Sequence, residues 1–316
     1  MKSGLISCFL LLVCGVGHSS AWSQTAVHNA VVASSPAKRI ISLAPHITEQ
    51  LYAAGAGGKL VGNVDYGDYP PAAKALPKVG GYTQPDLEAI LALKPDLVIA
   101  WQSGNPPAVL EKLRAMGIAL YVSQPDRIED VAREIERFGV LAGTESVANP
   151  AAAAFRARHA ALAARFSQRP VVDVFYQIWK QPLMTVNDKQ IISDVIRLCG
   201  GRNVFGSLPI LAPTVTVEAV LTANPEVIVA SGMGDERPEW LNDWPRWKTL
   251  AAVKRDNLYF IPPQEIQRHT PRLLDGAEKL CLALDAAREK RPANRPTNRP
   301  ANNEQLNPQA NAQRSK

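Results

Sequence analysis

Short apolar runs alternate along the chain with segments in which apolar residues recur every three or four positions. The strand-like runs cover residues 39–43, 60–64, 97–101, 119–122, 171–178, 227–230 and 258–261. Helical periodicity separates the first four of them, over residues 48–54, 87–93 and 108–116. Strands separated by helices are typical of parallel sheets built from βαβ units. The pattern therefore predicts an α/β protein with two parallel sheets.

The middle of the chain loses the strand signal. Residues 128–141 suit one helix, and the Ala-rich residues 151–166 suit a longer one that begins at Asn149-Pro150. A final helix is predicted from Pro271 to about Ala287. The predicted units are an α/β lobe over residues 38–125, a helical connector over 126–169, a second lobe over 170–287 and a disordered tail over 288–316, which is rich in Pro, Asn and Gln.

Two segments 130 residues apart resemble each other. Residues 86–100 align without gaps on residues 216–230, and residues 51–55 resemble residues 196–200. Duplicated lobes explain this, although any junction of helix, proline and strand gives some similarity. Duplication places Glu88 and Glu218 at equivalent first turns of short helices, where the helix dipole favours a carboxylate.

The N-terminus has the features of an export signal. Lys2 precedes an apolar run over residues 5–16, and small residues at 19–21 predict cleavage after Ala21. The run is shorter than the ~20 residues that span a bilayer. Lipid attachment at Cys14 is an alternative that the bulky Val13 disfavours. We expect a protein of the periplasm with a cleaved signal over residues 1–21.

Charge excludes one class of partner. The 35 basic and 29 acidic side chains give a net charge of +6, but residues 22–287 hold 27 of each, so the excess lies at the two ends. A neutral body has no need of the basic face that binds nucleic acid.

Export also changes how the cysteines are interpreted. Cys8 and Cys14 leave with the signal, so that Cys199 and Cys281 remain. In an oxidising compartment such a pair favours a disulfide, with two buried free thiols as the alternative.

No catalytic or metal-binding motif is evident. The five histidines lack metal-ligand spacing, and there is no nucleophile elbow, phosphate loop or dinucleotide fingerprint. We therefore expect a protein that is not an enzyme and has no metal or cofactor of its own. A periplasmic enzyme that uses His46, Glu49 or His269 stays open as an alternative.

Aromatic residues in loops point to a binding site instead. Tyr66 and Tyr69 follow the second strand, Tyr82 lies in a Gly-Gly turn, and Trp101 ends a buried strand. Ligands of open parallel sheets collect beyond the carboxyl ends of the strands. Large rings there suit a broad, flat, partly apolar ligand.

Several stretches carry a family resemblance: residues 39–45 (RIISLAP), 65–71 (DYGDYPP), 87–101 (LEAILALKPDLVIAW), 199–205 (CGGRNVF) and 270–272 (TPR) followed by Cys281. On these the chain resembles the periplasmic cobalamin-binding proteins of ABC importers, within a class of receptors that also bind haem and iron-siderophores. The resemblance implies two Rossmann-like lobes with parallel sheets, joined by a long rigid connector helix. It further implies a monomer that captures a corrinoid between its lobes and delivers it to an inner-membrane permease and its ATPase.

The resemblance also implies roles for particular residues. Glu88 and Glu218 match carboxylates that dock on the permease, and Cys199 and Cys281 match a disulfide. The matching ligand-binding positions are Tyr66, Tyr82, Trp101, Gln264, Glu265, Ile266, Gln267 and Arg268. Two departures, Ala212 and the loop 264–268, reduce stacking area in the second lobe. A haem or iron-siderophore receptor is the alternative within the class.

Overall fold

A computed structural model of the chain describes residues 35–232, 234 and 236–292. The predicted signal over residues 1–21 lies outside these residues, as does most of the predicted tail. Among the helices that are described, none combines the length and apolar character needed to cross a membrane.

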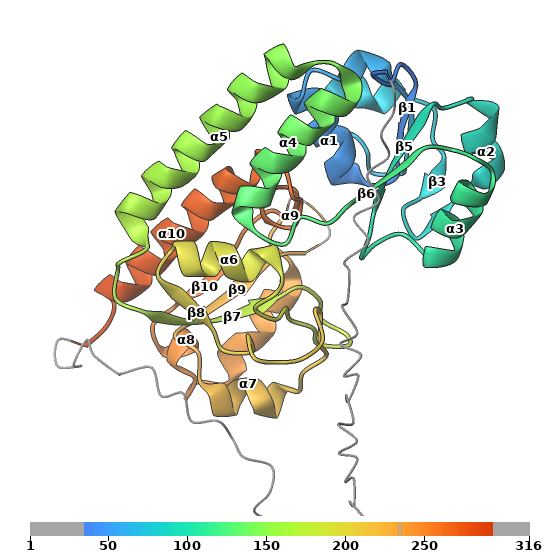
Figure 1. Cartoon of the computed structure of the whole chain (residues 1–316). Coiled ribbons are helices and arrows are strands. Elements are labelled where there is room, and N and C mark those ends of the chain that lie inside the picture. Colours follow the sequence, from blue (N-terminus) through green and yellow to red (C-terminus); the bar gives the residue numbers. More distant parts are fainter. Residues whose placement is uncertain (1–34, 233, 235, 293–316) are drawn as a thin grey trace, which may run out of the picture. The chain divides into compact units, whose positions relative to one another are not determined.

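Two four-stranded parallel sheets organise the chain (Figure 1). The first sheet has the order β2-β1-β5-β6 and consists of β1 (Ile40–Ser42), β2 (Leu60–Asn63), β5 (Leu97–Trp101) and β6 (Leu120–Ser123). The second has the order β10-β9-β7-β8 and consists of β7 (Val172–Gln177), β8 (Gly201–Asn203), β9 (Val227–Ala230) and β10 (Leu258–Phe260). We call the α/β units built on these sheets the first and the second lobe. The prediction of an α/β fold with two parallel sheets is confirmed.

Both sheets have one topology. Counted along the chain within each lobe, the strands lie side by side in the order second, first, third, fourth. A strand order that reverses between the first and third strands leaves a crevice at the carboxyl ends of those strands. Each lobe therefore offers a ligand-binding edge at the same place. β8 was not predicted, because its three residues, Gly-Arg-Asn, have no apolar run.

Helices lie between the strands of each lobe, and the last two helices of the second lobe follow its final strand. They are α1 (Pro45–Ala53), α2 (Leu87–Ala92) and α3 (Pro107–Ala115) in the first lobe, and α6 (Ile191–Leu198), α7 (Val217–Ala223), α8 (Ala251–Lys254), α9 (Pro263–Ile266) and α10 (Leu273–Glu289) in the second. Three 3-10 segments cover Gly57–Lys59, Pro71–Ala75 and Glu239–Arg246, and β3 (Gly80–Gly81) pairs with β4 (Gln84–Pro85) in a small hairpin.

The two lobes repeat each other in detail. The side chain of Asp86 accepts hydrogen bonds from the first turn of α2, and that of Thr216 does so for α7. Gly55 and Gly200, which follow α1 and α6, both have left-handed φ angles, 77° and 66°. Glycine tolerates this conformation without steric cost. The structure therefore places both aligned segment pairs at equivalent points of the two lobes.

The connector is a pair of helices, α4 (Ile128–Ala142) and α5 (Glu145–Phe166), which pack along each other (Figure 1). The predicted start of α5 at Asn149-Pro150 was wrong, since the helix begins at Glu145 and contains Pro150. Proline removes one hydrogen bond from a helix. Close packing holds the first turn in place, because a Cβ added to Gly139 would lie only 2.3 Å from the Cβ of Ala148.

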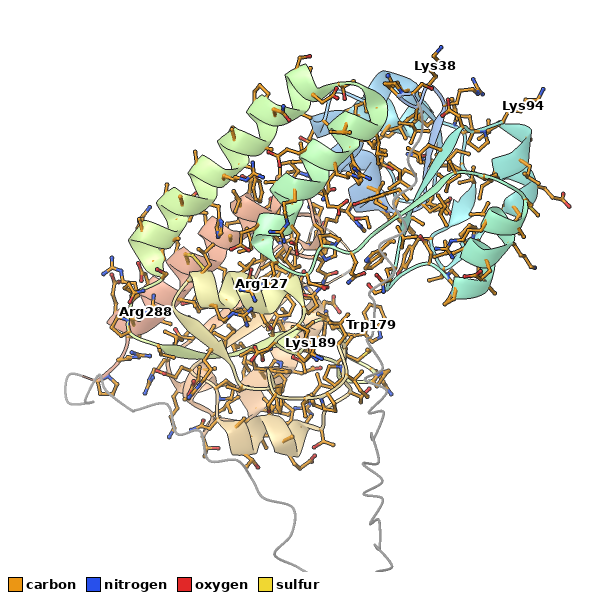
Figure 2. The ribbon with its side chains drawn as sticks, in the orientation of Figure 1. Lys38, Lys94, Arg127, Trp179, Lys189 and Arg288 are labelled. Carbon is orange, nitrogen blue, oxygen red and sulfur yellow. A yellow bond between two sulfur atoms is a disulfide. The ribbon has the colours of Figure 1, made fainter. Side chains whose placement is uncertain are left out.

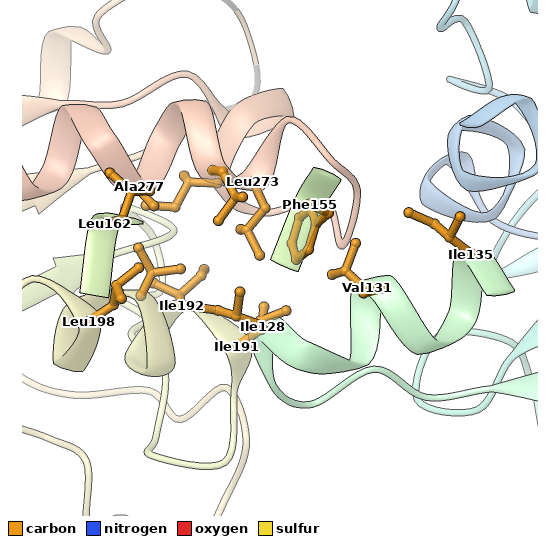
Figure 3. Close-up of a cluster of buried hydrophobic side chains, with 14 of the residues drawn as sticks. Ile128, Val131, Ile135, Phe155, Leu162, Ile191, Ile192, Leu198, Leu273 and Ala277 are labelled. Atoms are coloured by element: carbon orange, nitrogen blue, oxygen red, sulfur yellow. The ribbon is translucent and has the colours of Figure 1, made fainter. Parts of the chain in front are cut away.

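One hydrophobic core continues from the first lobe through the connector into the second lobe. Figure 3 shows Ile128 and Val131 of α4 close to Phe155 of α5, Ile191 of α6 and Leu273 of α10. All five side chains are at most 5% exposed. Because this core is shared, the helices bind both sheets into one packed unit.

A disulfide joins Cys199 to Cys281, as predicted, and links the end of α6 to α10. Both residues are fully buried, and 82 residues separate them in sequence. Closing so long a loop reduces the conformational entropy of the unfolded chain.

The variant Cys199→Ala/Cys281→Ala is expected to lose about 4 kcal/mol of unfolding free energy, because the unfolded chain regains its loop entropy. Urea unfolding under oxidising conditions measures the loss. Wild-type protein unfolded with a reductant present is the control and should approach the stability of the variant. Equal stability of variant and oxidised wild type would show that the bond contributes nothing.

Candidate functional site

A cavity of about 580 Å³ lies at the carboxyl ends of both sheets. The first lobe lines it with His46 after β1, with four residues of the segment 66–71 after β2, and with Trp101 at the end of β5. The second lobe lines it with Gly232 after β9 and with residues of the segment 263–272 after β10. Its volume falls in the range of small-molecule sites. The two equivalent edges of the lobes therefore share one cavity.

Six of the eight ligand-binding positions predicted from the sequence line this cavity. They are Tyr66, Tyr82, Trp101, Gln264, Gln267 and Arg268. Glu265 and Ile266 do not line it, since Ile266 is fully buried in the core and Glu265 forms an ion pair with Lys279. Both belong to α9, and successive side chains of a helical turn point in different directions.

Trp101 is held by a residue that the sequence analysis missed. The side chain of Asn105, 3% exposed, accepts a hydrogen bond from the backbone N–H of Trp101 at 2.6 Å. Its Nδ2 donates to the carbonyls of Leu43 and Tyr82 at 2.9 and 2.8 Å. One amide thus connects the ends of β1 and β5 to the turn that carries Tyr82. A single Asn in a loop gave no sequence signal for this role.

Gly104 provides room for the Trp101 ring. A Cβ at this position would lie 1.8 Å from Cε3 of the ring, so that only glycine permits the ring to pack on the backbone. The ring of Tyr82 lies beside that of Trp101, with centroids 5.8 Å apart. The first-lobe side of the cavity is therefore a preformed aromatic surface.

Arg268 connects the second lobe to the loop after β2. It donates to Asp68 Oδ1 at 3.1 Å and to the carbonyl of Tyr66 at 3.2 Å. Tyr66 has a left-handed φ of 60° and is 69% exposed. A tyrosine rarely adopts this conformation. The contacts of Arg268 stabilise it and keep the exposed ring at the cavity.

A second ion pair crosses between the lobes. Arg272 donates to both carboxylate oxygens of Glu49 at 2.7 and 2.6 Å, and its guanidinium lies 3.8 Å from the centre of the Tyr69 ring. Glu49 is 3% exposed. A bidentate ion pair offsets the desolvation cost of burying a carboxylate. Glu49 therefore serves as a lobe-to-lobe contact rather than as a free catalytic base.

Trp179 lies just beyond the carboxyl end of β7 and is 40% exposed (Figure 2). Its indole N–H donates to the carbonyl of Gln181, and its ring packs edge-on against Trp240 with centroids 6.4 Å apart. Neither Trp179 nor Ala212 lines the cavity. Trp179 places apolar surface at the ligand-binding edge of the second sheet, and the sequence analysis did not single it out.

His46 and His269 meet at the base of the cavity, one from each lobe. Their ring centroids are 4.9 Å apart at an interplanar angle of 72°, and His46 also packs edge-on against Trp101 at 5.1 Å. Burial, followed by the charges of His269 and Arg268, holds the pKa of His46 well below its usual value. Burial lowers the pKa of His269 from 6.5 to about 4. Both imidazoles are neutral at pH 7.

The docking residues predicted from the sequence lie elsewhere. Glu88 and Glu218 are exposed in the first turns of α2 and α7, and neither lines the cavity. Within the part of the chain that the structure describes, no three His, Cys, Asp or Glu side chains group to hold a metal ion.

The two histidines make stability depend on pH. An unfolded chain protonates His269 near pH 6.5, whereas the folded protein does so only near 4, so that unfolding takes up a proton between these values. The unfolding free energy should therefore fall as the pH decreases, by about 2 kcal/mol from His269 alone between pH 7 and 5. Urea unfolding of wild type, His269→Gln and the control His159→Gln at both pH values tests this. The unfolding free energy of His269→Gln should decrease less between pH 7 and 5 than that of the other two proteins. An equal decrease in all three would show that His269 does not cause the pH dependence.

Comparison with known proteins agrees with the fold. The family model described as "Periplasmic binding protein" matches residues 40–265. A vitamin B12-binding protein from Vibrio campbellii is 41% identical over 268 residues, which cover 83% of this chain and 95% of the relative.

Solved structures show the same relationship. The periplasmic vitamin B12-binding protein of Vibrio cholerae superposes with a TM-score of 0.76 at 39% identity, covering 80% of this chain and 99% of that one. A periplasmic haem-binding protein from Roseiflexus, in apo form, gives a TM-score of 0.69 at 26% identity, covering 79% and 99%. Because the family match and these relatives extend over most of the chain, the protein belongs to the periplasmic binding protein family.

Proposed function

We propose that this protein captures cobalamin or a related corrinoid in the periplasm and delivers it to an inner-membrane ABC importer. The aromatic surface of the cavity carries the proposal. Tyr66, Tyr69, Tyr82 and Trp101 all line the first-lobe side, and burying a flat macrocycle against such rings is favourable. The two relatives with about 40% identity are both named as vitamin B12-binding proteins.

Both arginines that line the cavity are already paired with carboxylates, and the remaining cation of its lining, Lys74, is exposed to solvent, which favours a neutral ligand periphery. Arg268 is paired with Asp68, and Arg272 with Glu49, so that neither guanidinium is free for an anionic ligand. The second-lobe side also offers the amides of Gln264 and Gln267. A corrinoid carries neutral carboxamides around its ring, whereas haem carries carboxylates and ferric siderophores are usually anionic. Polar neutral groups pair well with side-chain amides.

In this proposal the lobes comprise residues 38–125 and 170–287, and the connector comprises residues 126–169. The signal over residues 1–21 directs the chain to the periplasm, where the protein acts as a monomer. Capture makes and breaks no bond of the corrin ring. Glu88 and Glu218, at equivalent points of the two lobes, pair with basic residues of the permease.

Titration calorimetry with cyanocobalamin, haemin and a ferric siderophore tests the ligand. Cyanocobalamin should bind with a stoichiometry near one and more tightly than the other two. Preferential binding of haemin would favour the haem-receptor alternative, and chemical turnover of any of the three would favour an enzyme. No binding of cyanocobalamin would refute the proposal.

The rings of the cavity should supply affinity. Trp101→Ala and Tyr82→Ala each remove apolar contact worth about 1–3 kcal/mol, which weakens cyanocobalamin binding by about one to two orders of magnitude. Trp247→Ala, which removes a ring outside the cavity, is the matched control and should bind as wild type does. Unaltered affinity in both cavity variants would exclude stacking on these rings.

The paired glutamates should affect transport alone. Glu88→Ala/Glu218→Ala is expected to bind cyanocobalamin with wild-type affinity and to abolish uptake into proteoliposomes that contain the importer, because charge-assisted docking contacts are lost. Glu111→Ala/Glu239→Ala removes one exposed glutamate from each lobe as a control and should transport normally. A parallel loss of ligand binding in the first variant would show that its residues were misassigned.

A further inference from the structure

His46 and His269 are the last two members of a continuous row of rings. Tyr82, Trp101, His46 and His269 follow one another with centroid separations of 5.8, 5.1 and 4.9 Å. The row begins in the first lobe and ends in the second, so that the two imidazoles mark the point where the lobes meet. A flat guest that contacts the rings of both lobes would lie over this point.

Both imidazoles have unused nitrogen atoms. His46 Nε2 and His269 Nδ1 are sealed from solvent without a hydrogen-bond partner in the described part of the chain. The opposite nitrogens, His46 Nδ1 and His269 Nε2, are not sealed in this way, and both residues line the cavity. A neutral imidazole has one N–H and one lone pair. When the sealed nitrogen of each ring carries the hydrogen, this N–H lies against a neighbouring ring in the edge-on packing. The lone pair then belongs to the other nitrogen, which faces the cavity.

An imidazole lone pair is a good ligand for a transition metal. Two histidines alone make a poor site for a free ion, and the described residues supply no third His, Cys, Asp or Glu to complete one. A metal already held in a macrocycle has its equatorial positions filled and needs one axial ligand only. The pair therefore suits the metal at the centre of a bound macrocycle.

We propose that one imidazole of the His46–His269 pair coordinates the cobalt of a corrinoid whose upper ligand is exchangeable water. This rests on the proposed function. The lone pair forms a Co(III)–N bond, the Co–O bond breaks, and the water leaves with its electron pair. No electron is transferred and no proton is gained or lost. A cyanide or alkyl upper ligand blocks the step, so that such corrinoids are bound by the ring contacts and hydrogen bonds alone. The pair thus selects among corrinoids by their upper ligand.

The experiment compares aquocobalamin with cyanocobalamin on the full-length protein. The visible spectrum of aquocobalamin should change on binding to that of an imidazole-coordinated corrinoid, while the spectrum of bound cyanocobalamin keeps its cyanide-coordinated form. Aquocobalamin should also bind at least about tenfold more tightly. Nuclear magnetic resonance of protein labelled with ¹⁵N-histidine provides a measurement without any variant, since one imidazole nitrogen should shift with aquocobalamin and not with cyanocobalamin.

The variant His46→Gln/His269→Gln should lose the spectral change, and its affinities for aquocobalamin and cyanocobalamin should become equal within about threefold, whatever the change in their absolute values. The single variants identify the coordinating imidazole. His159→Gln, on α5 and outside the cavity, should keep both properties.

The failures are distinguishable. If cyanocobalamin binds but neither the aquocobalamin spectrum nor the ¹⁵N signals change, the coordination is refuted and the proposed function stands. A spectral change that persists in the double variant also refutes it. If neither corrinoid binds, the proposed function itself is wrong.

Discussion

The shared core beneath the two sheets is the constraint on which the site depends. α4 and α5 contribute side chains such as Val131 and Phe155, and α6 and α10 contribute Ile191 and Leu273 to the same buried cluster. Close packing leaves little freedom for such elements to shift relative to one another. Because the carboxyl edges of the two sheets are held in this way, side chains more than 200 residues apart in sequence line one cavity. The disulfide between α6 and α10 reinforces the second-lobe part of this core.

Polar contacts across the cavity join the two lobes in addition to the shared core. Glu49 and Arg272 form a bidentate ion pair, and Arg268 holds both Asp68 and the carbonyl of Tyr66. These pairs join the lobes and at the same time neutralise the two guanidinium groups that line the cavity. Aromatic rings, amides and neutral imidazoles then determine the character of the cavity. That combination suits a flat guest with a neutral polar edge and a metal centre.

Local patterns predicted most elements because each strand and amphipathic helix has its own periodicity. They were wrong where packing overrides local preference. Pro150 is a helix starter by its chemistry, yet α5 begins at Glu145 because Ala148 packs against Gly139. They were also wrong in α9, where neighbouring side chains of a helical turn point in different directions. Gln264 lines the cavity, whereas Ile266 is buried in the core. The role of Asn105 could not be predicted, because its three hydrogen-bond partners come together only in the folded chain.

The sequence by itself determined the fold class, the internal repeat, the family resemblance and the aromatic residues at the ends of the strands. These properties depend on short segments of sequence, so that periodicity and local composition are enough to predict them. Only the tertiary structure decided that His46 meets His269, that Glu49 is bound by Arg272, and that Asn105 supports Trp101. The physical reason is that burial and pairing of side chains depend on which surfaces face each other. Those surfaces come together only when both lobes pack on the shared core.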